Sequence, residues 1–182
     1  MKSKKSKTLV VNFFGGPGAG KSTNSAKLFA ELKDRGINCE LVREYAKDLV
    51  WEERKVEFKN QMAIAGKQIK RIDAVEGQVD VIVTDSPIIL SSYYNQRYKA
   101  EFDALLIKVF NDYENFNIVL TREKAYNPKG RFQTEDEAKG IDAGVVKMLD
   151  EFKLPYTVFS VSEKSIKDLG DLVVERIKEF GF

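Results

Sequence analysis

The octapeptide Gly15-Gly16-Pro17-Gly18-Ala19-Gly20-Lys21-Ser22 constrains the fold of this chain most strongly, because it fits the pattern G-x-x-x-x-G-K-[ST]. An apolar run at residues 9–14 precedes it, and a helix-like run at residues 26–32 follows. Glycines allow the backbone to curl so that its N–H groups point inward, and the positive end of the following helix adds to the attraction for an anion. The sequence therefore predicts a phosphate-binding loop between a strand and a helix.

Two side chains of this segment have chemistry of their own. Lys21 can reach the β- and γ-phosphates of a nucleoside triphosphate, and Ser22 can ligate Mg²⁺. The predicted nucleotide-binding residues form one continuous stretch: Gly15, Gly16, Pro17, Gly18, Ala19, Gly20, Lys21, Ser22 and Thr23.

Composition narrows the chemistry further. The chain has 182 residues, enough for one domain with a substantial core, and its formal net charge is +2. It has no histidine, which excludes histidine-based catalysis and histidine metal sites. The single cysteine, Cys39, cannot form a disulfide within the chain and suits a reducing, cytoplasmic location.

The first seven residues are basic and precede an apolar run, which is the outline of a signal peptide. Here the apolar run leads directly into the phosphate-binding motif, so cleavage would destroy that motif. We therefore expect residues 1–7 to form a flexible basic arm, either solvated or in contact with nucleic acid, and residues 8–182 to form a single domain. No segment is long enough to span a membrane, and the sequence leaves the oligomeric state open.

Strand-like and helix-like segments alternate along the chain, which predicts a parallel sheet covered on both faces. In the long helical region at residues 45–76, with a break near residues 53–55, we expect Phe58, Met62, Ala65, Ile69 and Ile72 to face the core. The expected strands are residues 9–14, 37–42, 79–85, 117–121 and 156–161. The other expected helices begin at residue 22 and at Pro87, and include one with Phe102, Leu105, Leu106, Val109 and Tyr113, one with Ala138, Ile141, Val145, Met148 and Phe152, and one with Ile166, Leu169, Val173, Ile177 and Phe180.

Ligands of such sheets bind beyond the carboxyl ends of the strands. The phosphate-binding loop, Glu44, Asp85 and Arg122 each follow a predicted strand. We therefore expect these groups to converge on one edge of the sheet.

Asp85 ends the run Val81-Ile82-Val83-Thr84, which is the Walker B pattern. Such a carboxylate can hold Mg²⁺ or accept a proton from the attacking group. Alternatively, Asp85 or Ser86 could cap a helix that starts near Pro87. Motor-type ATPases commonly have Glu where this chain has Ser86, and the guanine-reading Asn-Lys-x-Asp element is missing. Phosphoryl transfer to an acceptor other than water is therefore favoured.

A polar stretch at about residues 122–137 is typical of a mobile lid. Arg122, Lys124, Lys129 and Arg131 place four cations within ten residues, and Gly130 permits movement. Arginine can stabilise the charge of a transferring phosphoryl group, and a closed lid excludes water. Arg122 and Arg131 are the preferred pair, although a solvated basic loop would have the same composition.

The helical region after the second strand is the expected binding site of the acceptor. Gln61 and Gln68 share a helix face, Arg71 follows one turn later, and an amide can pair with the edge of a nucleobase. Each of these residues taken alone is equally compatible with a core or surface position. The aromatic residues that could stack on a base or line the pocket are Tyr45, Trp51, Phe58, Tyr93 and Tyr94.

With these features, the chain resembles the nucleotide-kinase branch of the P-loop proteins, in particular small phage-encoded thymidylate-kinase-like and nicotinamide-riboside-kinase-like proteins. The resemblance covers nearly the whole chain. It rests on the phosphate-binding loop and on Arg43-Glu44-Tyr45-Ala46, Thr84-Asp85-Ser86-Pro87 and residues 126–135. It implies an α/β three-layer sandwich with a five-stranded parallel sheet in the order 2-3-1-4-5 and a basic lid.

The resemblance also implies an ATP- and Mg²⁺-dependent kinase. Glu44 corresponds to the residue that accepts the proton of the acceptor hydroxyl in nucleoside kinases, and Arg43 would contact an anion. The sequence departs from thymidylate kinases at Tyr45 and at Ser86-Pro87, where those enzymes have Pro and Asp-Arg.

The sequence thus predicts Lys21, Glu44, Asp85, Arg122 and Arg131 as catalytic residues, with Ser22 and Asp85 on the metal. Either Glu44 or Asp85 accepts the proton of the acceptor hydroxyl. The acceptor site is predicted to comprise Arg43, Tyr45, Phe58, Gln61, Gln68 and Arg71. The leading acceptor is the hydroxymethyl group of 5-hydroxymethyluracil in phage DNA. The alternatives are a free nucleoside, nicotinamide riboside or a nucleoside monophosphate, and a non-catalytic ATP-binding regulatory module.

Overall fold

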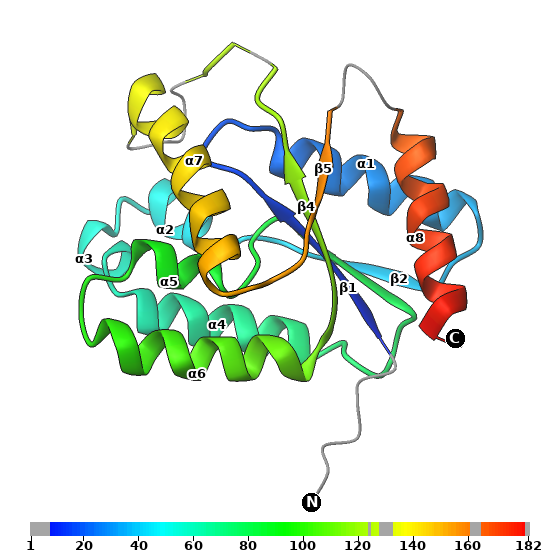
Figure 1. Cartoon of the computed structure of the whole chain (residues 1–182), viewed down its shortest axis with the longest axis horizontal. Helices are drawn as coiled ribbons and strands as arrows, with labels where there is room; N and C mark the ends of the chain where they lie inside the picture. Colours follow the sequence, from blue (N-terminus) through cyan, green and yellow to red (C-terminus); the bar gives the residue numbers. More distant parts are fainter. Residues whose placement is uncertain (1–7, 124, 128–132, 161–164, 181–182) are drawn as a thin grey trace, which may run out of the picture.

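A parallel β-sheet organises the molecule, and its central strand leads into the phosphate-binding motif (Figure 1). The computed structural model describes residues 8–123, 125–127, 133–160 and 165–180. Within these residues the sheet has five strands in the order β2-β3-β1-β4-β5, as the sequence predicted. The strands are β1 (Leu9–Phe14), β2 (Cys39–Val42), β3 (Val81–Thr84), β4 (Glu114–Leu120) and β5 (Thr157–Phe159).

Strand β1 is buried along its whole length, because it pairs on both sides and is covered on both faces. Leu9 is in register with Val81 of β3 and with Glu114 of β4. All pairings are parallel, so the carboxyl ends of the strands meet at one edge of the sheet. Apart from Asn12, the residues of β1 are all apolar, which is the near-continuous apolar run typical of a parallel strand covered on both faces.

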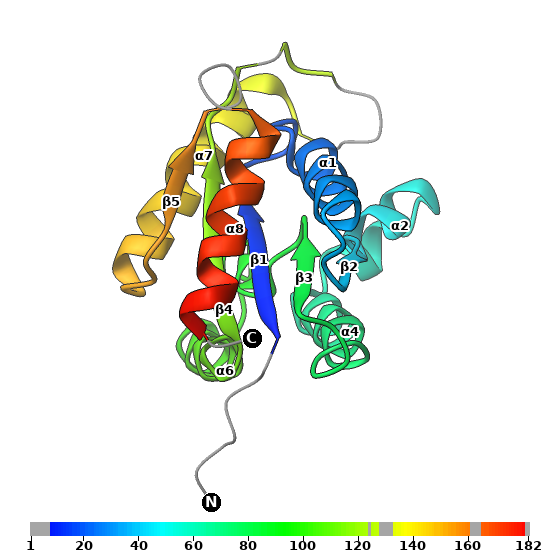
Figure 2. The same cartoon turned by 90° about the vertical axis from the view of Figure 1, so that its right-hand side faces the viewer.

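Helices cover the two faces of the sheet (Figures 1 and 2). Helix α1 (Lys21–Asp34) and helix α8 (Ile166–Phe180) pack on one face through Leu28, Leu32, Leu169 and Val173. The opposite face is covered by α4 (Gln61–Asp73), α5 (Leu90–Tyr94), α6 (Lys99–Asp112) and α7 (Glu135–Glu151). The three-layer α/β sandwich is thus confirmed.

The long helical region expected after β2 consists of three helices. These are α2 (Ala46–Trp51), α3 (Lys55–Phe58) and α4. The expected break near residues 53–55 is present, with Glu53 at a φ of 56°. A second break follows α3, where the Asn60 side chain accepts a hydrogen bond from the Ala63 N–H and caps α4. The only local signal for this break is Asn60 itself, a residue type that favours N-caps.

The second break changes the buried face of the region. Met62 was expected to face the core, but it is 45% exposed, because the buried face of α4 is formed by Gln61, Ile64, Ala65, Gln68 and Ile72. In α6, Leu105 is 58% exposed, and the buried residues are Phe102, Leu106 and Phe110. Phe180, at the end of α8, is 39% exposed.

Cys39 is buried, and desolvation raises the pKa of its thiol. Among the described residues, no helix is both long and apolar enough to cross a membrane.

The central strand should dominate the stability of the fold. We expect Phe13→Ala, at a position that is 0% exposed, to lower the free energy of unfolding by about 3–5 kcal/mol, because it leaves a cavity between the layers. Phe180→Ala should cost much less, because that ring is 39% exposed. Chemical denaturation of both variants, fitted with a common dependence of the free energy of unfolding on denaturant concentration, would measure the two losses. Equal losses would contradict the buried, central position of β1.

Candidate functional site

The phosphate-binding motif forms the turn between β1 and α1. Gly15, Gly18 and Gly20 have φ values of 141°, 82° and 95°, which side-chain-bearing residues rarely adopt. Gly20 is the N-cap of α1, and no side chain caps this helix. The first turn of α1 also contains no acidic residue. The N–H groups and positive dipole end of α1 are therefore available to an anion.

Lys21 folds back over the loop that precedes it. Its ammonium group donates hydrogen bonds to the Gly15 carbonyl at 2.7 Å and the Gly16 carbonyl at 3.1 Å. Burial lowers the pKa of Lys21, whereas the nearby carboxylates of Glu44, Asp85 and Asp142 raise it. A cation surrounded by three acidic side chains is held within the loop by charge as well as by hydrogen bonds.

Asp85 lies at the carboxyl end of β3 and is 4% exposed. Its carboxylate accepts a hydrogen bond from the backbone N–H of Glu44 at 2.9 Å, so it ties the ends of β2 and β3 together. The alternative role as a helix cap is not what the structure shows. Helix α5 begins at Leu90 with Ile89 as its N-cap, so neither Asp85 nor Ser86 caps it.

Glu44 lies just after β2 and forms part of a cavity wall. Desolvation raises the pKa of its carboxyl, Lys21 opposes this shift, and the like charge of Asp85 reinforces it. A carboxylate with a raised pKa is a stronger proton acceptor than an exposed glutamate, which suits a general base.

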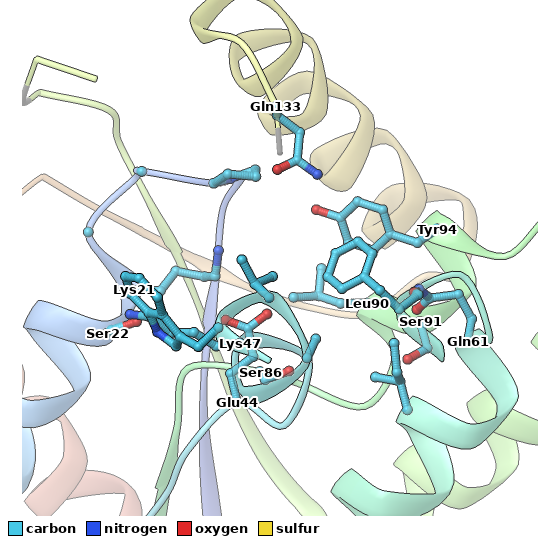
Figure 3. Close-up of a pocket in the computed structure, with 18 of the residues that line it drawn as sticks. Lys21, Ser22, Glu44, Lys47, Gln61, Ser86, Leu90, Ser91, Tyr94 and Gln133 are labelled. Atoms are coloured by element: carbon cyan, nitrogen blue, oxygen red, sulfur yellow. The ribbon is translucent and has the colours of Figure 1, made fainter. Parts of the chain in front are cut away.

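A cavity of about 240 Å³ connects the phosphate-binding loop with α2, α4 and α5 (Figure 3). Lys21, Ser22 and Glu44 lie on one side, with Gln61, Ser91 and Tyr94 across from them. The residues lining it are Pro17, Gly18, Gly20, Lys21, Ser22, Thr23, Glu44, Ala46, Lys47, Val50, Trp51, Phe58, Gln61, Ile64, Ser86, Leu90, Ser91, Tyr94 and Gln133.

The predicted acceptor residues divide into two groups. Phe58 and Gln61 line the cavity, whereas Arg43, Tyr45, Gln68 and Arg71 are not part of its wall. Gln68 is buried, accepts a hydrogen bond from the Tyr45 N–H at 3.2 Å, and donates to the Arg43 carbonyl and the Thr84 hydroxyl, each at 3.4 Å. Its polar groups are therefore used within the fold.

Arg71 also serves the local structure. It donates to the Arg43 carbonyl at 3.0 Å and to the Asp48 carboxylate at 2.9 Å, and it lies over the Tyr45 ring at 5.3 Å from the centroid. Together with Gln68, Arg71 braces the backbone on either side of Glu44.

Sequence reasoning missed several residues of the cavity wall. Lys47, Ser86, Ser91 and Gln133 all line the cavity. Lys47 lies in the first turn of α2, three residues after Glu44, and this closeness along the chain was the one available signal. Ser86 comes from the segment between β3 and α5, Ser91 from α5 and Gln133 from the segment before α7, and only the tertiary fold brings these to the loop.

Arg122 is one of the two predicted lid arginines, and it contacts the phosphate-binding loop directly. It forms an ion pair with Asp142 of α7 at 2.7 Å and donates to the Pro17 carbonyl at 2.9 Å. Arg131, with Lys124 and Lys129, lies outside the described residues, so the expectation that Arg122 and Arg131 act as a pair remains a prediction.

The residues at the loop fit Mg²⁺ bound together with a nucleotide. Ser22 lies exposed at the start of α1, and Asp85 lies at the end of the adjacent strand β3. Among the described residues, no group of three or more Cys, Asp or Glu side chains could hold a metal ion by itself. One hydroxyl and one carboxylate suit Mg²⁺, which takes its remaining ligands from phosphates and water.

A phosphate-binding loop between β1 and α1, with a buried aspartate at the end of the adjacent parallel strand, defines a P-loop nucleotide-binding protein. A family model described as an AAA domain matches residues 10–167. The chain therefore belongs to this AAA domain family of P-loop NTPase-like proteins. A search of curated proteins found no match to the chain.

We expect Lys21→Ala to weaken MgATP binding by about tenfold or more, because a charge-assisted contact to phosphate is lost. Lys27→Ala is the matched control, since Lys27 is exposed on the same helix. Isothermal titration calorimetry would measure both. Unchanged affinity in Lys21→Ala would contradict the assignment of the loop as the phosphate site.

Proposed function

We propose that the chain is a kinase that transfers the γ-phosphate of ATP, with Mg²⁺, to a hydroxyl group of a nucleoside-type acceptor. One observation supports this proposal most strongly. A single cavity contains the phosphate-binding loop, the Glu44 carboxyl and a wall of aromatic and amide side chains that includes Phe58, Gln61 and Tyr94. A phosphate donor and a flat, hydrogen-bonding acceptor could thus meet within reach of a proton acceptor.

In this proposal the chain binds the donor through backbone N–H groups of the loop, the start of α1 and Lys21. Ser22 and Asp85 would hold Mg²⁺, which when bound would offset the negative charge on the β- and γ-phosphates. The acceptor hydroxyl oxygen forms a bond to the γ-phosphorus. The bond between that phosphorus and the oxygen bridging to the β-phosphate breaks, and ADP leaves.

Glu44 is the better candidate for the base. It lines the cavity and has a raised pKa, whereas Asp85 accepts a hydrogen bond from the Glu44 backbone and is absent from the cavity wall. The proton of the acceptor hydroxyl would pass to the Glu44 carboxylate. Ser86 stands where motor-type ATPases have a glutamate, which favours transfer to an acceptor over hydrolysis.

Two considerations favour a particular acceptor: the resemblance of the chain to phage-encoded kinases, and the side chains that line the cavity. The resemblance to phage-encoded kinases favours the hydroxymethyl group of 5-hydroxymethyluracil in DNA. Trp51, Phe58 and Tyr94 offer ring faces for stacking, and Gln61 offers an amide for the edge of a base. A cavity of about 240 Å³ suits one nucleoside-sized group. A base within a duplex would therefore have to leave the stack before transfer.

Transfer from γ-labelled ATP tests the proposed reaction. We expect label in DNA that contains 5-hydroxymethyluracil and none in matched thymine DNA, because only the former has the added hydroxyl. A panel of free nucleosides, nicotinamide riboside and nucleoside monophosphates is assayed in parallel.

Each result leads to a different conclusion. Label in a panel member would retain the kinase and replace the acceptor. Tight MgATP binding without transfer to any acceptor would favour a regulatory module. Release of labelled phosphate at the same rate with and without acceptors would identify a hydrolase and contradict the proposal.

A pH profile tests the base. Glu44 must be ionised to accept a proton, and its pKa is raised by burial, so kcat/KM should fall as the pH drops through a value above the ordinary glutamate pKa of about 4.3. Glu44→Gln should lower kcat by about 10²–10⁴-fold and remove this acidic limb. Glu40→Gln, at an exposed position of β2, the strand that precedes Glu44, should behave like the wild type. A retained acidic limb in Glu44→Gln would transfer the role to another group, with Asp85 as the next candidate.

A further inference from the structure

Helix α7 approaches the phosphate-binding loop more closely than any side chain at Gly16 would allow. A Cβ atom at Gly16 would lie 2.6 Å from the Ala138 carbonyl oxygen and 2.9 Å from Asp142 Oδ1. The φ angle of Gly16 does not itself require glycine, since Gly16 is not among the positive-φ residues. The glycine at this position is therefore explained by the approach of α7.

Asp142 makes two contacts from this helix, one with each carboxylate oxygen. Oδ1 accepts a hydrogen bond from the Gly16 N–H at 2.5 Å, and Oδ2 pairs with Arg122 Nε at 2.7 Å. The negative charge of Asp142 is thus balanced by Arg122 beside a loop that binds anions.

Two of the three guanidinium nitrogens of Arg122, Nε and Nη2, donate hydrogen bonds within the protein. Nε is bound to Asp142, while Nη2 donates to the Pro17 carbonyl at 2.9 Å and the Ala138 carbonyl at 3.4 Å. The Arg122 side chain is only 11% exposed. Nη1 is buried and finds no hydrogen-bond partner among the described residues.

The surroundings of Nη1 indicate which kind of hydrogen-bond acceptor it would bind. A Cβ atom at Gly18 would lie 3.1 Å from Nη1 and 3.0 Å from the ring of Tyr126, so this nitrogen lies beside that ring at the central turn of the phosphate-binding loop. A buried donor without a partner is costly, whereas a charge-assisted bond from arginine to a phosphate oxygen is strong. A nucleotide phosphate held by the loop would supply such an oxygen.

We propose that Asp142 is a positioning residue for nucleotide binding, holding Arg122 so that Nη1 stays beside Gly18 of the phosphate-binding loop while it anchors the loop at Gly16. The proposal rests on the nucleotide-binding part of the proposed function and on no particular acceptor. Asp142 acts through Arg122, so its contribution should depend on the presence of Arg122.

A double-mutant cycle on MgATP binding tests this dependence. The fluorescence of Trp51, the only tryptophan and a residue of the cavity wall, or calorimetry reports the affinity. Asp142→Asn keeps an oxygen for the Gly16 N–H but removes the charge that orients Arg122. We expect it to weaken MgATP binding about tenfold in the wild-type background and to have little effect in an Arg122→Gln background.

Two further variants complete the test. Asp142→Glu restores the carboxylate and should recover part of the affinity, and Glu151→Gln, exposed near the end of the same helix, should bind as the wild type does. An equal loss in both backgrounds, no loss, or a gain in affinity for Asp142→Asn would overturn the proposal. A wild-type chain that binds no MgATP would overturn the proposed function as well, whereas an additive cycle in a chain that binds MgATP overturns only this inference.

Discussion

The parallel pairing of β1 with β3 and β4 is the constraint on which the rest of the structure depends. It places the phosphate-binding loop between the ends of two neighbouring strands, next to Asp85 on one side and Arg122 on the other. The pairing is stabilised because β1 is apolar on both faces apart from Asn12, whose amide donates to Asn115 and Asn117 of β4, and because helices cover both sides of the sheet. The site is thus a consequence of burying the central strand.

Charge is concentrated where the strands end. Lys21 lies near Glu44, Asp85 and Asp142, and the direction of its pKa shift reflects burial opposed by these carboxylates. The same cluster raises the pKa of Glu44 through desolvation and through Asp85. Such groups are costly to bury unless they are paired, so their grouping beside a loop built for anions indicates a site and not only a structural network.

Some features of the fold and the site follow from local sequence patterns, and others do not. The strand order, the position of the loop between β1 and α1 and the position of Asp85 at the end of β3 were predicted correctly, because each rests on local chain geometry or on a resemblance that covers nearly the whole chain. Gln68 and Arg71 share a face with Gln61, yet only Gln61 lines the cavity. Helical spacing shows which residues share a face of α4. It does not show that only the first turn of that face, which contains Gln61, lies at the cavity.

The sequence by itself determined the phosphate-binding loop, the alternation of strands and helices, and the edge of the sheet where the chemistry lies. These follow from glycine conformations and apolar periodicity, which act over a few residues. Only the tertiary structure decided that Asp142 pairs with Arg122 against Gly16 and that Gln133 and Ser91 complete the cavity wall. Those contacts join residues far apart in the chain, and they depend on how α5 and α7 pack on the sheet, which no local pattern encodes.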